Sequence, residues 1–405
     1  MLQDTIIIKG IKVSDFPEDE LTVQGIFLHN HNWEIYQALN NTKLRKIEKK
    51  EVNKMLNCRE EKRGFIKYYC ECCDENRTIH FGCNSRICSR CGKSHSDKWA
   101  NKISKCMFEV PHRHTVLSLP ERMWEIFRKD RSLLKVLMDS VIETLNNVLS
   151  HVLHKKIKVG AIVVLHPFSR DLSYKPHVHI LMTEGGFDSK AHFNPKVFIP
   201  YKSMRKVWQY TILTNLKKAL SDTKVNAEFI DRLFKDYPNG FYAHLPEKSR
   251  IKSKRHISKY VGRYIRHPAI ANYRLCGYDG KHVTFWYKDN QGKVHYKTMG
   301  VFKFIEGIIQ HIPDRQFKMI RHYGAYCRKR KRMFKRYLPL RSLTQLKLYD
   351  FKRKGLDICP NCGCHMRVVD FRKKGPPDSP AFGERLFDWQ HMLDRGFVQS
   401  ISITE

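Results

Sequence analysis

Two histidines separated by one residue stand at the start of an apolar, β-branched run, KPHVHILMTEGG, at residues 175–186. In an extended chain, residues i and i+2 point to the same face of a sheet and the residue between them points to the other. His177 and His179 would therefore lie side by side, while Val178 and Ile180 face a core. Two imidazoles that converge in this way can hold one divalent metal ion. The alternative is a strand that turns two polar residues toward solvent.

The charge of the chain indicates the kind of partner it binds. Lys+Arg 75 against Asp+Glu 40 gives a formal net charge of +35 over 405 residues. Basic side chains that neutralise phosphates release condensed counterions, so a polyanion such as nucleic acid is the natural partner. The aromatic residues, 12% of the chain, are interleaved with the basic ones, which suits stacking on unpaired bases. Binding to an anionic membrane surface is the alternative.

The sequence predicts a soluble, cytoplasmic protein that is associated with the nucleoid when bound to DNA. No stretch approaches the roughly 18 apolar residues of a membrane span, and the N-terminus lacks the layout of a signal peptide. In such a compartment the 13 cysteines would stay largely reduced. Their clustering therefore points to metal binding rather than to disulfides.

A cysteine-rich block lies between residues 58 and 91. It holds two C-x-x-C pairs, namely Cys70 with Cys73 and Cys88 with Cys91. Four thiolates at about 2.3 Å match the tetrahedral preference of Zn²⁺ and leave no open position for catalysis. We therefore expect a structural zinc site that folds a small nucleic-acid-binding module. Further candidate ligands in this block leave a second site open: Cys58, Cys72, Cys83, His80 and His95.

A last cysteine group, CPNCGCHMR, lies near the C-terminus. Cys359, Cys362 and Cys364 form one knuckle, and the tail supplies no obvious second pair. His365 or His391 could complete a site there.

The segment RHISKYVGRYIRH, residues 255–267, is predicted to be a helix. Tyr260 and Tyr264 are four residues apart and would lie on one helix face, about 6 Å from each other. Lys259, Arg263 and Arg266 surround them and could contact phosphate. Such a pair alone is typical of core packing. Combined with a histidine metal site, it predicts a tyrosine that attacks a DNA phosphodiester.

Several other segments carry clear secondary-structure signals. Helices are predicted at residues 33–39, 131–156 and 200–220, and strands at 113–120, 158–169, 177–186 and 240–247. Residues 282–299 read as a β-hairpin with the turn DNQG. Because strands and helices are mixed irregularly, the pattern favours an α+β fold over a repeating βαβ array.

Many collinear segments resemble the HUH-type two-tyrosine transposases of rolling-circle insertion sequences, the IS91-like family. They include FGCNSRICSRCGKSHSDKWA, VVLHPFSRDLSYKPHVHILMTEGGF, YVGRYIRHPAIANYRLCGYDGKHVTFWY and CPNCGCHM. The resemblance implies an HUH endonuclease core with a central antiparallel sheet flanked by helices, preceded by a small zinc-binding domain. It also implies nicking and joining of single-stranded DNA at the element's ends through a 5′-phosphotyrosine, with Mg²⁺ or Mn²⁺ as the catalytic ion.

The resemblance also assigns roles to residues. His177 and His179 take the HUH positions, and Tyr260 and Tyr264 take the nucleophile positions. His166, on the neighbouring predicted strand, matches a family position for a third metal ligand. Asp171 and His256 compete with it for that role. Where family members often have a histidine before the proline of the HUH segment, this chain has Lys175, which we expect to contact phosphate.

The expected organisation is an N-terminal helical segment at 1–50, a zinc-binding domain at 51–105, a catalytic domain at 106–335 and a basic tail at 336–405. The expected partners are single-stranded element ends and target DNA, with no membrane and no small-molecule substrate. Two alternatives stay open, an HUH replication initiator or relaxase and a non-catalytic zinc-dependent nucleic-acid-binding protein. No helicase phosphate loop of the G-x-x-x-x-G-K-[ST] type is present. The oligomeric state, the DNA sequences recognised and the order of tyrosine attack stay open as well.

Overall fold

The computed structural model describes residues 21–195, 199–220, 227–245, 268–289, 291–328, 331–338 and 357–373. The chain divides into two compact units, one made of Met1–Leu56 and Asn84–Lys347 and the other of Asn57–Cys83 and Leu348–Glu405. The second unit therefore joins part of the cysteine-rich block to the C-terminal tail, which the sequence predicts as separate domains. The individual boundaries expected from sequence stay predictions.

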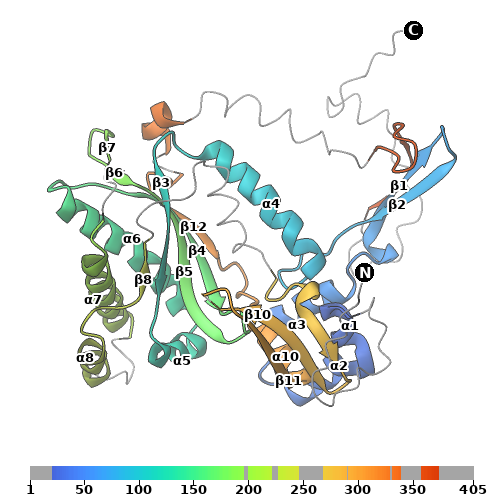
Figure 1. Ribbon diagram of the computed structural model, residues 1–405, viewed down its shortest axis with the longest axis horizontal. Coiled ribbons are helices and arrows are strands. Elements are labelled where there is room, and N and C mark those ends of the chain that lie inside the picture. The colour runs from blue at the N-terminus through green and yellow to red at the C-terminus, as the bar shows by residue number, and fades with distance from the viewer. Residues whose placement is uncertain are drawn as a thin grey trace, which may run out of the picture. The chain divides into compact units, whose positions relative to one another are not determined.

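The largest sheet in the described part of the first unit has five antiparallel strands in the order β12-β4-β5-β3-β8. Its strands are β3 (His112–Ser118), β4 (Gly160–Phe168), β5 (Tyr174–Thr183), β8 (Ala243–His244) and β12 (Ile320–Gly324). The two most apolar strands, β4 and β5, lie in the interior of the sheet, where each pairs on both edges (Figure 1). The expected central antiparallel sheet is thus confirmed.

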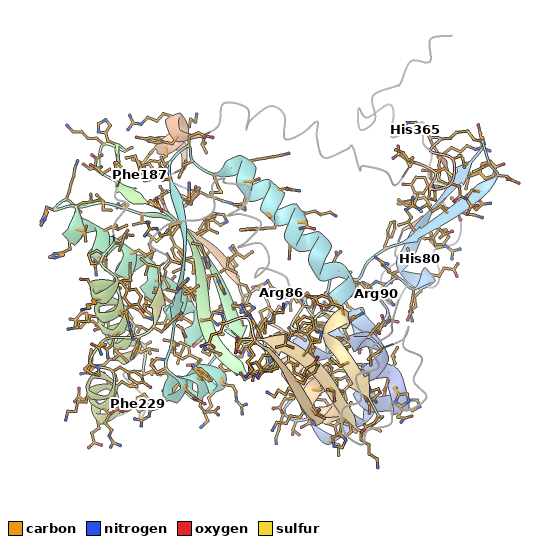
Figure 2. The ribbon with its side chains drawn as sticks, in the orientation of Figure 1. His80, Arg86, Arg90, Phe187, Phe229 and His365 are labelled. Atoms are coloured by element: carbon orange, nitrogen blue, oxygen red, sulfur yellow. A yellow bond between two sulfur atoms is a disulfide. The ribbon has the colours of Figure 1, made fainter. Side chains whose placement is uncertain are left out.

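One face of this sheet packs against four helices. Val163 of β4 and Val178 and Ile180 of β5 are fully buried in this core. The helices are α5 (Glu121–Lys129), α6 (Leu133–Val152), α7 (Tyr201–Ala219) and α8 (Ala227–Asp236). Figure 1 shows α6, α7 and α8 together on one side of β4 and β5, and Figure 2 labels Phe229 of α8, which packs on this core. The predicted inward orientation of Val178 and Ile180 is confirmed.

The opposite face of the sheet is covered over only part of its length. Ile162, Val164 and Leu181 pack there against Phe108 and against Phe187, which Figure 2 labels. The elements around this second core are α4 (Ser89–Cys106), β6 (Gly185–Phe187), β7 (Phe193–Pro195) and the 3₁₀ helix η5 (Lys331–Tyr337). Because β4 and β5 are buried on both faces at this end, their sequences read as continuous apolar runs. The histidines of β4 and β5 lie at the other end of these strands, where His166 pairs with His177.

A three-stranded antiparallel sheet, β11-β10-β9, also belongs to the described first unit. Val283 and Phe285 are buried on the face toward the following helix, where the rings of Phe285 and Phe304 lie 6.2 Å apart. The strands are β9 (Leu275–Tyr278), β10 (His282–Lys288) and β11 (Val294–Gly300), and the helix is α10 (Val301–Ile309). The other elements of this region are α1 (Val23–Leu28), η2 (His29–His31), α2 (Asn32–Leu39), α3 (Lys46–Leu56) and η4 (Asn272–Arg274).

The described part of the second unit is built on an antiparallel sheet in the order β13-β1-β2. Its elements are η3 (Glu61–Arg63), β1 (Gly64–Cys70), β2 (Glu75–His80) and β13 (Arg367–Lys373). Tyr68 and Cys70 pack with Cys359 and Met366 in a small core. The C-terminal strand β13 thereby completes a sheet that begins some 300 residues earlier, since Gly64 pairs with Lys373.

Most strong sequence signals correspond to observed elements. The helix predicted at 131–156 is α6, the helix at 200–220 is α7, and the hairpin at 282–299 is β10 with β11. The helix predicted at 255–267, with Tyr260, Tyr264 and their basic neighbours, lies outside the described residues. Among the residues that are described, no helix is both long and apolar enough to cross a bilayer.

Candidate active site and cysteine clusters

Three histidines converge on the sheet face opposite α5–α8. His166 of β4 and His177 of β5 are direct register partners across the two strands, and His179 follows two residues later on the same face. The ring centroids are 4.9 Å apart for His166 and His177, 5.1 Å for His177 and His179, and 5.7 Å for His166 and His179. One nitrogen from each ring lies within 4.8 Å of the others, so the three can share one metal ion.

Hydrogen bonds to Nδ1 of His177 and of His179 orient these two rings. His177 Nδ1 lies 2.7 Å from the carbonyl oxygen of Lys175. A carbonyl only accepts, so Nδ1 carries the proton and Nε2 keeps its lone pair. His179 Nδ1 lies 3.0 Å from Nε2 of His114, a histidine of β3 whose ring stacks at 14° on that of His179. A metal-binding histidine is commonly held in this way through its second nitrogen.

The electrostatics favour the neutral form of these rings. Burial lowers the pKa of His177 to about 4, and the nearby Lys175 ammonium adds to the effect. Burial also lowers the pKa of His179 well below its usual range, with further lowering from the surrounding histidines and Arg170. A neutral imidazole is the form that binds a metal. The donor set therefore fits a divalent ion through three nitrogens.

Of the two competing third ligands, the structure describes one, Asp171. Asp171 accepts hydrogen bonds from the backbone and hydroxyl of Ser173, at 3.2 and 2.7 Å, and from Lys297 Nζ at 3.0 Å. Burial alone would raise the pKa of Asp171, but these contacts outweigh it and bring the pKa down to about 2. Asp171 is therefore engaged in its own loop. His256 lies outside the described residues, so His166 is the third candidate ligand that the structure brings to the pair.

Sequence reasoning missed His114. It lies in the predicted strand at 113–120, but nothing in that strand indicates that β3 pairs with β5. The other predicted site residues divide into two sets. Lys175 is described, and its ammonium lies 5.8 Å from the ring centre of Trp124. Tyr260, Tyr264, Lys259, Arg263 and Arg266 lie outside the described residues.

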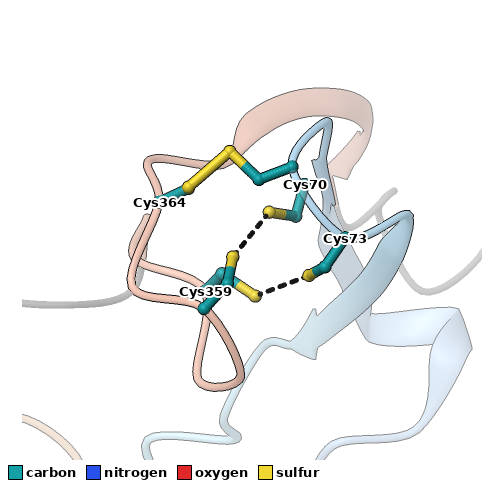
Figure 3. The surroundings of a disulfide bond; sticks show 6 residues. Cys70, Cys73, Cys359 and Cys364 are labelled. Carbon is teal, nitrogen blue, oxygen red and sulfur yellow. Dashed lines mark hydrogen bonds between the residues drawn. A yellow bond between two sulfur atoms is a disulfide. The ribbon is translucent and has the colours of Figure 1, made fainter.

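The cysteine pairs combine differently from the expectation. Cys70 and Cys73 form a group with Cys359 and Cys362 of the C-terminal knuckle, not with Cys88 and Cys91. The Sγ atoms of Cys70 and Cys362 are 3.4 Å apart and those of Cys73 and Cys359 are 3.5 Å apart (Figure 3). The expected set is corrected because the antiparallel pairing of β1 with β13 brings the two knuckles together.

This composite group fits zinc. Sulfurs of a tetrahedral site with Zn–S bonds of about 2.3 Å are separated by about 3.8 Å, close to what the two pairs show. Backbone N–H groups of Cys362 and Asn361 point at the Cys359 sulfur and lower the pKa of this thiol to about 7. His365, expected as a completing ligand, instead lies exposed with Nδ1 3.3 Å from Asp357. His391 lies outside the described residues.

The remaining cysteines lie outside the composite group. Cys58 and Cys83 are buried in the second unit, and Cys88 and Cys91 are buried in the first. Cys72 and Cys364 form a disulfide beside the composite group (Figure 3). The other 11 cysteines, all among the described residues, take part in no disulfide.

Comparison with known proteins places these sites in context. Residues 160–333 match a family model described as "Putative transposase", and residues 28–119 match the "Transposase zinc-binding domain". The first match contains the three histidines and the second contains Cys58 through Cys91.

Two relatives agree with these matches. The chain is 27% identical over 329 residues to the transposase for insertion sequence element IS801 of Pseudomonas savastanoi pv. phaseolicola, covering 78% of each chain. It is 26% identical over 308 residues to "Putative transposase y4qJ" of Sinorhizobium fredii, covering 72% of this chain and 77% of the relative. Among solved structures, the origin-recognition/nickase domain of non-structural protein 1 from human bocavirus is 14% identical, with a TM-score of 0.24 over 47% of this chain and 72% of that one. A TM-score this low does not establish a shared fold.

The matches and the relatives indicate a transposase with a zinc-binding domain, and the structure gives it a mixed α+β fold with a central antiparallel sheet. Taken together, the two family-model matches and the relatives support an IS91-like rolling-circle transposase.

Proposed function

We propose that this transposase nicks and rejoins single-stranded DNA at the ends of its insertion sequence through a 5′-phosphotyrosine, with a divalent ion at the three histidines. The observation that carries the proposal is the convergence of His166, His177 and His179 on one face of β4 and β5. These three imidazoles lie beside one another in two strands that are otherwise mostly apolar. They suit a reaction that needs a bound cation.

In the proposed reaction, the hydroxyl of Tyr260 or Tyr264 loses its proton and its oxygen bonds to the phosphorus of the scissile phosphodiester. The bond from phosphorus to the 3′ oxygen breaks, and that oxygen takes up a proton from water. A divalent ion would polarise a non-bridging oxygen and stabilise the charge that develops on the 3′ oxygen. Attack by another 3′ hydroxyl then joins strands and releases the tyrosine.

The other proposed roles concern positioning. A second tyrosine allows a second nick before the first strand is released. Lys175, Lys259, Arg263 and Arg266 are proposed to contact phosphates. Lys175 has a further role supported by geometry, since its carbonyl oxygen accepts the hydrogen bond that orients His177. We propose that the protein acts in the cytoplasm, on DNA of the nucleoid.

The donor set also bears on the ion. Three nitrogen ligands favour Mn²⁺ over Mg²⁺, because Mg²⁺ prefers oxygen ligands and lies below the first-row ions in affinity for imidazole. Water and phosphate oxygens would fill the remaining positions. We therefore expect Mn²⁺ to support the reaction at lower concentrations than Mg²⁺.

The test is formation of a covalent adduct between the full-length chain and labelled single-stranded DNA carrying an element end. Tyr260→Phe combined with Tyr264→Phe should abolish the adduct. His177→Ala should lower its rate by about 100-fold or more, since metal stabilisation of this kind is worth several kcal/mol. Tyr210→Phe, at an exposed position of α7, serves as the control and should behave as the wild type.

Three outcomes would contradict the proposal. An undiminished adduct in the double tyrosine variant would remove the nucleophile assignment. Binding without nicking, across varied single strands and with either ion, would favour a non-catalytic zinc-dependent DNA-binding protein. Cleavage at a plasmid origin rather than at element ends would favour a replication initiator or relaxase.

A further inference from the structure

The three-stranded sheet of the first unit has one packed face and one open face. Residues alternate along β10, so Val283 and Phe285 point toward α10 while Thr284 and Trp286 point away. Across the hairpin, Thr284 pairs with Thr298 and Trp286 pairs with Tyr296, so these side chains share the outer face. The outer face is open at Gly277 of β9, the register partner of Thr284, because a Cβ added there would meet nothing within 4 Å.

Aromatic rings dominate this outer face. Tyr296 is 52% exposed and Tyr273, from η4, is 74% exposed. Trp286 lies between them in the sheet, with its ring centroid 5.8 Å from that of Tyr273 and its Nε1 donating to the Tyr273 carbonyl at 3.2 Å. Exposed large aromatic rings on one face cost solvation unless a partner covers them. We call Tyr273, Trp286 and Tyr296 the aromatic face.

The charges around the aromatic face are positive. Lys288 Nζ and Arg274 Cζ each lie 6.0 Å from the ring centre of Trp286. The carboxylates at the two ends of β10, Asp279 and Asp289, accept hydrogen bonds from backbone N–H groups of their own turns. Aromatic rings flanked by cations are the arrangement on which unpaired bases stack while their phosphates meet positive charge.

The aromatic face is connected to the histidine site through one loop. Arg170, between His166 and His177 in the chain, donates from Nη1 to the carbonyl oxygens of Lys288 and Asp289, both at 2.9 Å. Arg274 donates back to the carbonyl of Arg170 at 2.6 Å, and Lys297 binds Asp171. The hairpin therefore holds the loop that joins the two histidine strands.

We propose that the aromatic face binds the unpaired bases of the DNA strand on which the histidine site acts, with base stacking on Trp286 and Tyr296. This inference rests on the proposed function and deepens it, because it assigns a binding surface to the single-stranded substrate. The net charge of +35 favours a polyanion over an apolar protein partner. Recognition by stacking is tolerant of sequence, so this surface would hold the strand and not select it.

The experiment measures the affinity of the full-length chain for a short fluorescein-labelled oligothymidine by fluorescence anisotropy at fixed salt. Trp286→Ala and Tyr296→Ala should each weaken binding by roughly 5- to 150-fold, which corresponds to about 1–3 kcal/mol per stacked base. Trp286→Phe keeps a ring and should stay within a few-fold of the wild type. Tyr210→Ala removes a ring that is 63% exposed on α7 and should leave affinity unchanged.

Other results would overturn the inference. Wild-type affinity in both Trp286→Ala and Tyr296→Ala would contradict stacking on these rings. An equal loss in Trp286→Phe would show that stacking is not involved, and an equal loss with duplex DNA of the same length would show general charge attraction. A change of oligomeric state in size-exclusion chromatography would assign the face to a second copy of the chain. The thermal midpoint and circular dichroism of each variant show whether it is folded, and Tyr273→Ala gives an independent third position.

The adduct assay separates this inference from the proposed function. The aromatic-face variants should need more DNA for half-maximal adduct formation but reach the wild-type rate at saturation. If no adduct forms with any variant or with the wild type, the proposed function fails while the anisotropy comparison still decides whether bases stack here.

Discussion

At the residue scale, the histidine site depends on a fourth histidine. His114 stacks on His179 and shares a hydrogen bond with its Nδ1, so it determines which nitrogen His179 presents. The alternation of His177 and His179 with Val178 and Ile180 could be predicted, because the period of a strand is two. The position of His114 could not, because strand neighbours are set by tertiary packing of distant segments.

His114→Leu should weaken Mn²⁺ binding by about 10- to 100-fold, the usual effect of losing an outer partner of a ligating histidine. His114→Gln keeps a hydrogen-bonding group and should restore most of the affinity. Titration with Mn²⁺ followed by electron paramagnetic resonance measures the effect. His151→Leu, a histidine at the end of α6, is the matched control. Equal affinity in His114→Leu and the wild type would show that His114 does not position His179.

At the element scale, the composite zinc group depends on one strand pairing. The antiparallel register of β1 and β13 aligns Tyr69 with Arg367 and places the two C-x-x-C knuckles at the same end of the sheet. Each knuckle could be recognised from its spacing. The pairing of the two knuckles could not be predicted, since spacing favours the pair that is nearest in sequence. In addition, the charged residues of β12 and β13 hide the alternating pattern expected of a strand. The strands β4 and β5 and the helices α6 and α7 were easier to predict, because their hydrophobic patterns extend over 9 to 20 residues.

Cys359→Ser should remove one equivalent of zinc per chain and destabilise the second unit, because metal binding is coupled to the folding of small metal domains. Zinc content measured by mass spectrometry of the purified protein checks this. Cys327→Ser, at a thiol outside the composite group, should retain the full content. Full zinc content in Cys359→Ser would contradict the composite assignment.

At the scale of the whole molecule, the excess of basic residues sets how binding responds to salt. Composition alone predicts a nucleic-acid partner, because the net charge of +35 is a property of the whole sequence and needs no fold. It does not locate the surface. The aromatic face and the histidine site depend on strands that come together from separate parts of the chain.

The affinity for single-stranded DNA should fall linearly in a plot of log affinity against log salt concentration. A strand that contacts about six phosphates would lose about 300-fold between about 50 and 200 mM salt, from a slope of about −0.7 per contact. Anisotropy titrations over this range measure the slope. Trp286→Ala should shift the line downward without changing the slope, because stacking releases no counterions. A slope near zero would contradict phosphate contacts as the main source of affinity.

The joining of β1 to β13 has a consequence for how the protein is made. Cys73 and Cys359 are separated by 286 residues, so the ribosome releases the first knuckle long before the second exists. At about 5–20 residues per second, the early thiols wait about 15–60 s for their partners. A nascent polypeptide that lacks Cys359 and Cys362 cannot form the four-cysteine site. The site and its sheet can therefore form only after β13 has been synthesised.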